Sequence, residues 1–293
     1  MDVIIDKGCG LDVHKETVVA CVMGTGIKKE IRTFDTMTGS LLRLKSWLID
    51  LGITHVAMES TGPYWKPVFN ILEDSFEVIL ANARHIKNVP GRKTDVKDSE
   101  WICKLLRSGL LTASFVPPQA IRDLRDLTRY RRKLIQAVSA EKNRIQKVLE
   151  DANVKLSSVA SDTFGVSAGK MVRAIISGNV DPVSLADLAV GRLKSKKDLL
   201  RDALQGHFRD HHGFMIQASL DHIEYMEKTI AKLDQQINEK LKDYHREREL
   251  LESIPAVKEQ GSASILAEIG ADMSVFPSAD HIISMGGDES REQ

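Results

Sequence analysis

Short runs of β-branched residues alternate with stretches of helical periodicity over the first 115 residues of this 293-residue chain. This alternation constrains the fold strongly, because strands and helices bury their apolar side chains on different repeats. The pattern predicts five strands, which are a first run from Val3–Ile5 into Asp12, then Thr17–Met23, Lys28–Phe34, Thr54–Met58 and Phe76–Leu80. It also predicts a basic loop over residues 82–94 and three helices, which are Ser40–Leu51, Pro63–Glu73 and Asp95–Ser108.

The order of these elements is three strands, a helix, a strand, a helix, a strand and a helix. Three consecutive strands predict an antiparallel meander, and each later helix predicts a right-handed crossover to a parallel strand. The result is a mixed five-stranded sheet covered by helices. This is the connectivity of the RNase H-like fold, so we predict an α/β domain of that kind for residues 1–116.

Four acidic residues fall where this connectivity brings distant segments together. Asp12 and Glu59 each end a predicted strand. Asp95 and Asp98 lie one turn apart at the start of the third helix. Carboxylates gathered at one sheet edge repel one another unless cations join them, and two divalent ions would also support phosphodiester chemistry. Each acid also has an ordinary interpretation, with Asp95 as a helix cap, Asp98 as a first-turn residue and Glu59 as a solvated strand end.

The distribution of charge favours a polyanionic partner, although the chain as a whole has a formal net charge of zero. Residues 84–147 contain sixteen Lys and Arg against six Asp and Glu, a local excess of ten positive charges. Such an excess suits a nucleic acid, and the alternative is a solvated basic helix. The candidate nucleic-acid-binding residues are Lys15, Arg84, Lys87, Arg92, Lys93, Arg129, Arg131 and Arg132.

The rest of the chain is predicted to be helical. After Pro117-Pro118, residues 119–151 carry the apolar stripe of one long helix, and short helical patches follow over residues 152–213. A helix over residues 216–244 has a heptad seam, formed by Ile223, Met226, Ile230, Leu233 and Ile237. The seam predicts a coiled-coil hairpin with residues 119–151 or a dimer contact, and the alternative is an ordinary amphipathic helix. The segment from Ser253 resembles a small helix–turn–helix unit that grips DNA phosphates.

Other features exclude several classes of protein. Cys9, Cys21 and Cys103 are odd in number and lack CxxC spacing, so we predict reduced thiols rather than disulfides or zinc ligands. His211 and His212 lack partner ligands at metal spacing and are predicted to lie on the surface. The sequence has no signal-peptide pattern and no apolar run of about 18 residues, so it predicts a cytoplasmic protein without a membrane span.

Four segments in order resemble the IS110-type transposases, which are also called DEDD transposases. They are GLDVHK at 10–15, MESTGPYW at 58–65, KTDVKDSEWI at 93–102, and SIPAVKEQGSASILAEIG at 253–270, which FPSADHI at 276–282 follows. The resemblance implies a RuvC-like domain over 1–116, a helical coiled-coil and dimerisation region over 117–250, and a C-terminal transposase domain over 251–293. It also implies a site for Mg²⁺ or Mn²⁺ formed by Asp12, Glu59, Asp95 and Asp98.

The same resemblance implies an activity and partners. Members of this family cut and rejoin DNA at the ends of prokaryotic insertion sequences. Members similar to this chain use a structured guide RNA that pairs with donor and target DNA, and a serine of the C-terminal domain attacks the DNA. Exchange of two DNA strands implies a homodimer or homotetramer.

The C-terminal segment departs from the family pattern. The family usually continues into a glycine-rich stretch with the nucleophilic serine, whereas this chain continues as SMGGDESREQ, and Ser290 lacks the following glycine and basic run. Ala256 and Lys258 stand where the family usually has glycines. We therefore expect a truncated or frameshifted C-terminal domain. Two alternatives to a transposase remain, a nucleic-acid-binding remnant without that serine and a RuvC-like nuclease of branched DNA.

Overall fold

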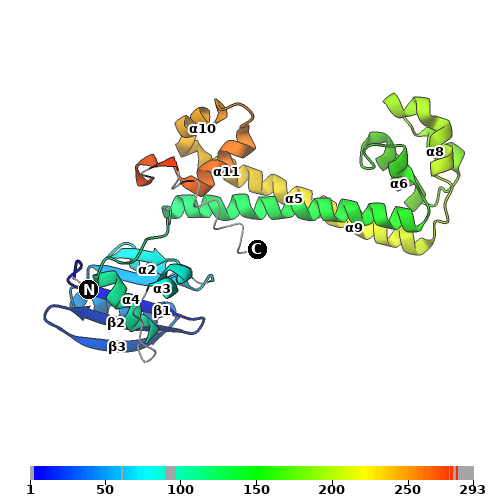
Figure 1. Cartoon of the computed structure of the whole chain (residues 1–293). Helices are drawn as coiled ribbons and strands as arrows, with labels where there is room; N and C mark the ends of the chain where they lie inside the picture. Colours follow the sequence, from blue (N-terminus) through cyan, green and yellow to red (C-terminus); the bar gives the residue numbers. More distant parts are fainter. Residues whose placement is uncertain (1–2, 61, 90–96, 277, 280–281, 283–293) are drawn as a thin grey trace. The chain divides into compact units, whose positions relative to one another are not determined.

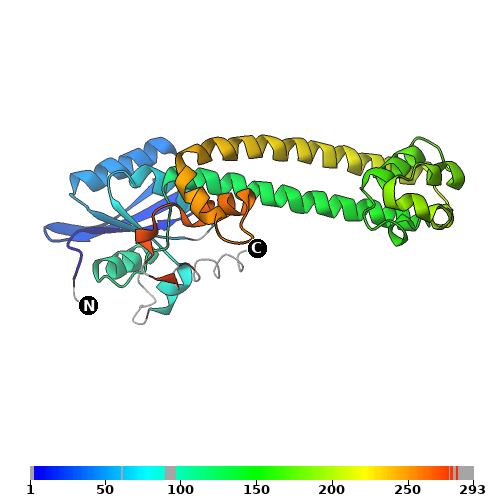
Figure 2. The same ribbon diagram turned by 90° about the horizontal axis from the view of Figure 1, so that it is seen from above.

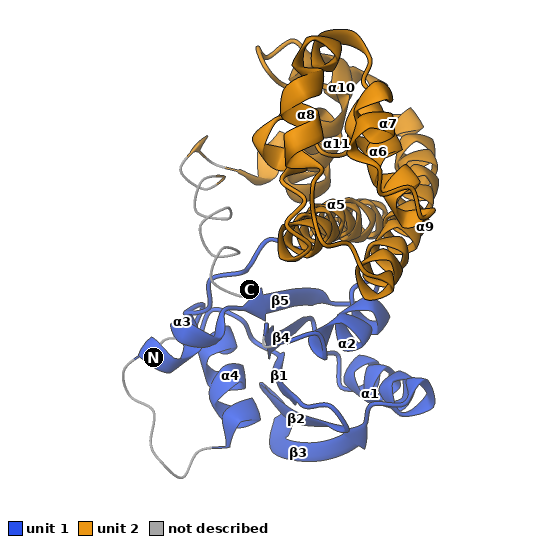
Figure 3. Ribbon diagram, turned by 90° about the vertical axis from the view of Figure 1, so that its right-hand side faces the viewer, with its two compact units in different colours: residues 1–116 blue, residues 117–293 orange. Residues whose placement is uncertain are grey.

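The structure is a computed structural model that describes residues 3–60, 62–89, 97–276, 278–279 and 282. Its helices and strands are labelled in Figure 1. The chain forms two compact units, an N-terminal unit of residues 1–116 and a C-terminal unit of residues 117–293 (Figure 3). A sheet with helices on both faces makes up the first unit, and helices make up the second.

The N-terminal unit is built on a mixed five-stranded sheet with the strand order β3-β2-β1-β4-β5. The strands are β1 (Gly8–Val13), β2 (Thr17–Gly24), β3 (Ile27–Asp35), β4 (His55–Glu59) and β5 (Glu77–Ala81). β2 pairs antiparallel with both β1 and β3, whereas β4 pairs parallel with both β1 and β5. The predicted mixed sheet is confirmed, and it is consistent with an RNase H-like fold.

Helices cover both faces of this sheet. They are α1 (Thr38–Asp50), α2 (Trp65–Leu72), α3 (Ala83–Asn88) and α4 (Asp98–Arg107). α1 and α2 pack on one face, around Leu11 and Val56, and α3 and α4 pack on the other, around Ala57 and Leu105 (Figure 3). Val56 and Ala57 are neighbours in β4 and point to opposite faces, which explains why this strand is apolar throughout its buried part.

Two predicted boundaries in this unit are wrong. The first strand begins at Gly8 and residues 4–7 form bends, because the Ile4 and Ile5 amides donate to the Arg107 carbonyl oxygen at 2.8 and 3.0 Å and not to a neighbouring strand. The predicted loop over 82–94 contains α3, since the Asn82 side chain accepts a hydrogen bond from the Arg84 amide and caps a helix. Residues 90–94 of that segment lie outside the described residues.

Two long antiparallel helices form the centre of the C-terminal unit. α5 (Gln119–Asp151) and α9 (Asp210–Lys240) lie side by side in both Figure 1 and Figure 2. The predicted helix over 119–151 is confirmed. Ile223 and Met226 of the heptad seam are buried in one core with Val138 of α5. The apolar face of α9 is therefore covered by packing within the unit.

Polar pairs fix the register of α5 and α9. Lys240 Nζ donates to Asp123 Oδ2 at 3.1 Å near one end, and His212 Nε2 lies 2.9 Å from Asp151 Oδ2 at the other. His212 is 2% exposed, so its prediction as a surface residue is wrong, whereas His211 is exposed. The adjacent histidines point to different sides of the helix, and only the second faces α5.

A cluster of short helices connects α5 to α9. Its members are η1 (Leu156–Ser158), α6 (Val166–Ile176), α7 (Pro182–Asp187), η2 (Gly191–Lys196) and α8 (Lys197–Ala203). Met171 and Leu200 are fully buried there and share a core with Ile145 of α5 and Ile216 of α9. The short helical patches predicted over residues 152–213 are thus present.

The last described segments pack against the start of α5 and the end of α9. They are η3 (Leu241–Tyr244), α10 (His245–Glu252), α11 (Glu259–Ile269) and η4 (Met273–Val275). Leu124, Ile237 and Leu266 are buried together in this core. The turn between α10 and α11 places Ala256 at φ 73°, a conformation that favours glycine. Ser290 lies outside the described residues, and among the described helices there is no apolar stretch of the length that a bilayer crossing needs.

Candidate active site

β1 and α4 meet at Gly10, where a side chain has no room. A Cβ atom at this position would lie 2.3 Å from both the Cys103 amide nitrogen and the Ser99 carbonyl oxygen. A Cβ atom on Gly8 would instead lie 3.1 Å from the Leu106 side chain. α4 therefore rests on the backbone of β1 and runs in the opposite direction. Alternate residues of a strand share a face, so Asp12 follows Gly10 on this face, toward the first turn of α4.

Parallel pairing brings Glu59 to the same edge of the sheet. Gly10 pairs with Ala57 and Leu11 pairs with Met58, so Asp12 and Glu59 follow at the ends of neighbouring strands. Ala57 packs in the core beneath α4, and Glu59, two residues later, shares its face. Asp98 is the first residue of α4.

Asp12 is half-buried among these charges. Burial raises the pKa of Asp12, and the Asp98 and Glu59 carboxylates raise it further, while His14 lowers it. His14 Nε2 lies 3.1 Å from Asp12 Oδ2. These effects agree with the strand register and with the position of Asp98 at the start of α4, which bring the three carboxyl groups to one edge of the sheet. Like charges held together oppose folding, and a bound cation relieves that repulsion.

The donor atoms suit a hard divalent cation. Carboxylate oxygens are the ligands that Mg²⁺ and Mn²⁺ prefer in proteins. Asp12, Glu59 and Asp98 supply such oxygens, but within the described part of the chain no three His, Cys, Asp or Glu side chains form a group that could hold a metal. The fourth predicted ligand, Asp95, lies outside the described residues. The chemistry of the donors therefore fits the ion, and the three described acids approach one another without closing around it.

The family model for DEDD transposases of the IS110 type, described as a transposase, matches residues 9–154. The chain belongs to this family. The matched residues include β4 and α4, nearly all of β1 and the whole of α5. β1, β4 and α4 position Asp12, Glu59 and Asp98. No curated protein matches the chain. Membership in a transposase family implies DNA binding and, in general terms, a DNA recombinase type of activity.

The candidate nucleic-acid-binding residues of this transposase differ in their surroundings. Lys15, Arg84 and Lys87 are exposed on the N-terminal unit. Their charges are accessible to solvent, as a contact with a DNA backbone requires. Arg92 and Lys93 lie outside the described residues.

The remaining three candidates are arginines of α5 that the sequence did not distinguish, and in the structure they differ in their ion pairs. Arg129 donates from Nε and Nη2 to the two carboxylate oxygens of Glu268, at 2.9 and 2.8 Å. Arg131 Nε donates to Asp234 Oδ1 at 2.5 Å. Arg132 is exposed and makes no ion pair within the part of the chain that the structure describes. The charges of Arg129 and Arg131 are thus partly neutralised inside the unit, and that of Arg132 is not.

Sequence reasoning missed the contact of His14 with the acidic site. The available signal was the Asp-x-His spacing in GLDVHK, because residues two apart on a strand share a face. Cys9, Cys21 and Cys103 form no disulfide, as predicted. Cys21 and Cys103 are buried together between β2 and α4, where they contribute to packing beneath the site.

Proposed function

We propose that this transposase binds DNA and cuts and rejoins it at insertion-sequence ends through a metal-dependent acidic site. The convergence of Asp12, Glu59 and Asp98 at one edge of the sheet carries this proposal, together with membership in the DEDD family. In this proposal Asp12, Glu59, Asp95 and Asp98 hold Mg²⁺ or Mn²⁺.

The chemistry divides between the ion and the chain. A divalent ion held there would lower the pKa of bound water and neutralise negative charge on the phosphoryl oxygens. The chain holds the carboxylates in place, because α4 packs against Gly10 and so keeps Asp98 near Asp12. His14 orients the Asp12 carboxylate through their hydrogen bond.

Positive charge on the same unit assists the approach of DNA. Lys15, Arg84 and Lys87 are exposed, and we propose that Arg92 and Lys93 join them. Neutralising phosphates releases condensed counterions, so binding should weaken steeply as salt concentration rises.

The proposal also divides the chain by function. Residues 1–116 would be the RuvC-like catalytic domain, residues 117–250 a coiled-coil region for dimer or tetramer formation, and residues 251–293 part of the C-terminal transposase domain. A structured guide RNA is the second proposed polynucleotide partner, and the cytoplasm of a prokaryote is the proposed setting. These assignments rest on the family.

Asp12→Asn tests the acidic site. Removing this charge should reduce Mg²⁺-dependent DNA cleavage at least about a hundredfold, because a preorganised charge at the reacting centre is lost. DNA binding, measured by mobility shift, should persist, since the variant repels phosphates less. Asp50→Asn is a matched control, because Asp50 is an exposed acid at the end of α1.

Cleavage by Asp12→Asn at the wild-type rate would rule out the metal site. If the wild-type chain binds DNA but neither cuts it nor forms a covalent adduct with Mg²⁺ or Mn²⁺, the alternative of a non-catalytic binding protein is favoured.

A further inference from the structure

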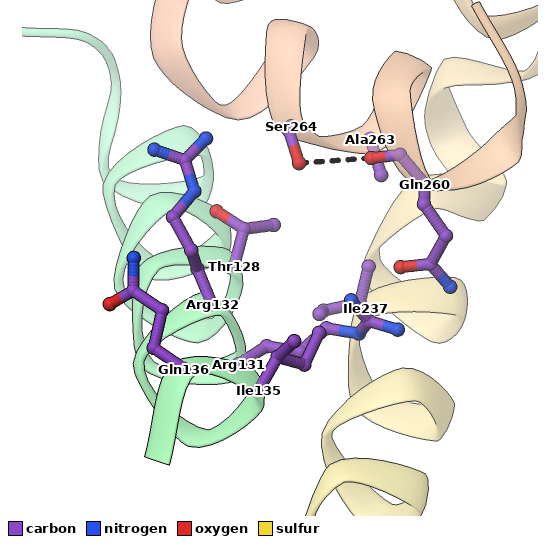
Figure 4. A pocket seen from close by; sticks show the side chains of 9 residues that line it. All are labelled: Thr128, Arg131, Arg132, Ile135, Gln136, Ile237, Gln260, Ala263 and Ser264. Carbon is purple, nitrogen blue, oxygen red and sulfur yellow. Dashed lines mark hydrogen bonds between the residues drawn. The ribbon is translucent and has the colours of Figure 1, made fainter. Parts of the chain in front are cut away.

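The C-terminal unit contains a pocket of about 230 Å³ lined by residues of α5, α9 and α11 (Figure 4). None of its 9 lining residues is acidic. A single water needs about 10–15 Å³ of such volume, so the pocket has room for an anionic group with its hydration. The pocket therefore has basic lining residues and no acidic ones.

The positive charge of the pocket comes chiefly from Arg132. Arg131 also lines the pocket, but its ion pair with Asp234 of α9 offsets its charge. Arg132 has no carboxylate partner among the described residues, and its guanidinium presents several N–H donors. A planar fork of donors on a permanent charge suits the oxygens of a phosphate group.

Uncharged polar side chains from α5 and α11 line the pocket beside Arg132. Gln136 lies one turn after Arg132 on the same face of α5, and Gln260 and Ser264 lie one turn apart on α11 (Figure 4). Each glutamine amide supplies two N–H donors. Ser264 Oγ already donates its hydrogen to the Gln260 carbonyl oxygen at 2.9 Å, so the donors left for a ligand are the two glutamine amides. The pocket therefore combines one guanidinium with amide donors and no competing carboxylate.

We propose that this pocket binds a phosphodiester group of DNA. The inference rests on the proposed DNA-binding function and adds to it a defined contact in the C-terminal unit. A phosphodiester carries one negative charge and accepts hydrogen bonds through its oxygens, which matches the single uncompensated guanidinium and the surrounding amides. Such a contact positions the DNA without reading its sequence.

The test compares neighbouring residues of α5 in the full-length chain. Binding to a short fluorescent DNA duplex is measured over about 50 to 200 mM salt. Arg132→Gln should weaken binding on the order of tenfold at low salt and lower the slope of log K against log salt by about one. Lys133→Gln removes the same charge from an exposed residue outside the pocket, and it should change affinity less than about threefold.

A second variant distinguishes hydrogen bonding in the pocket from a general effect of charge on DNA binding. Gln136→Leu removes amide donors without changing charge, so affinity should fall while the salt slope stays the same. Both positions are exposed on α5, and circular dichroism checks that the variants are folded.

Equal losses of affinity for Arg132→Gln and Lys133→Gln, or wild-type affinity for Gln136→Leu, would overturn the proposal that this pocket binds a phosphodiester. A loss seen with an RNA duplex but not with DNA would overturn the choice of ligand. If the wild-type chain binds no DNA, the proposed function fails before the pocket is tested.

Discussion

The two units of this transposase use charge in opposite ways. In the N-terminal unit the sheet gathers carboxylates of the same sign, and Asp98 and Glu59 raise the pKa of Asp12, which burial already raises. In the C-terminal unit acidic and basic side chains form ion pairs between the two long helices, as Arg131 does with Asp234. Complementary pairs serve register and stability. Like charges brought together oppose folding, so they indicate a place where the chain serves a ligand instead.

The same comparison identifies an exception within the C-terminal unit. Arg129 and Arg131 are paired, whereas the adjacent Arg132 faces a pocket without an acid. Arg132 is therefore a better candidate for a ligand contact than Arg129 or Arg131, because it lines a pocket and its charge is not offset by a carboxylate. Substitutions should separate residues that support the fold from residues that serve the sites.

The largest expected effect concerns the packing that positions the acids. Gly10→Ala places a Cβ atom 2.3 Å from backbone atoms of α4, which cannot yield as a flexible side chain does. We expect the N-terminal unit to lose about 3 kcal/mol of unfolding free energy, measured by urea denaturation. DNA cleavage should fall as well, because the displaced α4 would move Asp98 away from Asp12.

Gly39→Ala is the matched control for this substitution. Its Cβ atom would meet only Arg43 Nη1, at 3.9 Å, and the residue lies in the helix α1. Alanine should there be neutral or stabilising by up to about 1 kcal/mol. Equal destabilisation by both substitutions would contradict the close approach of α4 to β1.

The next effect concerns the end of the helical pair where α5 meets α9. His212→Ala removes the contact with Asp151 and the hydrogen bond that His212 Nδ1 accepts from the Arg209 amide at 3.1 Å. We expect a loss of about 2 kcal/mol of unfolding free energy for the C-terminal unit, because the buried His212 side chain and both of these contacts are lost. His211→Ala, which changes the exposed neighbour, should stay within about 0.5 kcal/mol. Indistinguishable variants would refute the structural role of His212.

A smaller effect of opposite sign is expected at the turn between α10 and α11. Ala256 has a φ of 73°, which places its Cβ atom in steric conflict with the backbone. Ala256→Gly should stabilise the C-terminal unit by about 0.5 to 1 kcal/mol in thermal unfolding. Ala256→Ser keeps the Cβ atom and should give no gain. A stabilising serine would show that strain is not the cause.

The smallest effect concerns pH and the pair of Asp123 with Lys240. Burial opposes ionisation of Asp123, but hydrogen bonds from Lys240 and Gln119 outweigh it and hold the pKa of Asp123 below its usual 3.8. A depressed pKa gives stability that is present above the unfolded value and disappears as pH falls through the folded value. Asp123→Asn should therefore cost less than about 0.5 kcal/mol near neutral pH, after screening by solvent. The difference should shrink as pH falls below 3.8 and vanish once Asp123 is protonated in the folded state, and a pH-independent cost would contradict the role of the ion pair.

Local patterns in the sequence predicted much of the fold. The β-branched run of β2 and the apolar stripes of α1 and α5 lie where periodicity placed them, because each element buries a face on its own repeat. α3 was missed because its basic residues suggested a loop, although Asn82 offered a cap signal. The approach of Asp12, Glu59 and Asp98 followed from topology, since strand ends and crossover helices meet at predictable edges.

Contacts between distant segments were not predictable in the same way. His212 and His211 have the same chemistry, and only packing against Asp151 decides that one is buried. Arg131 and Arg132 are likewise adjacent and identical, and the location of Asp234 on α9 decides which of them is neutralised. Such distinctions depend on which face of a helix meets which partner, and a single sequence does not record that pairing.

Because α5 and α9 pair along their whole length in a fixed antiparallel register, an insertion or deletion in one helix must be matched by one in the other. Asp123 meets Lys240 and Asp151 meets His212, so each step forward along one helix corresponds to a step back along the other. An insertion in α5 alone would move every later partner out of reach and rotate its apolar stripe by about 100° per residue. Heptads are expected to be gained or lost in both helices at once, which makes the span of this hairpin adjustable only in increments of about 10 Å.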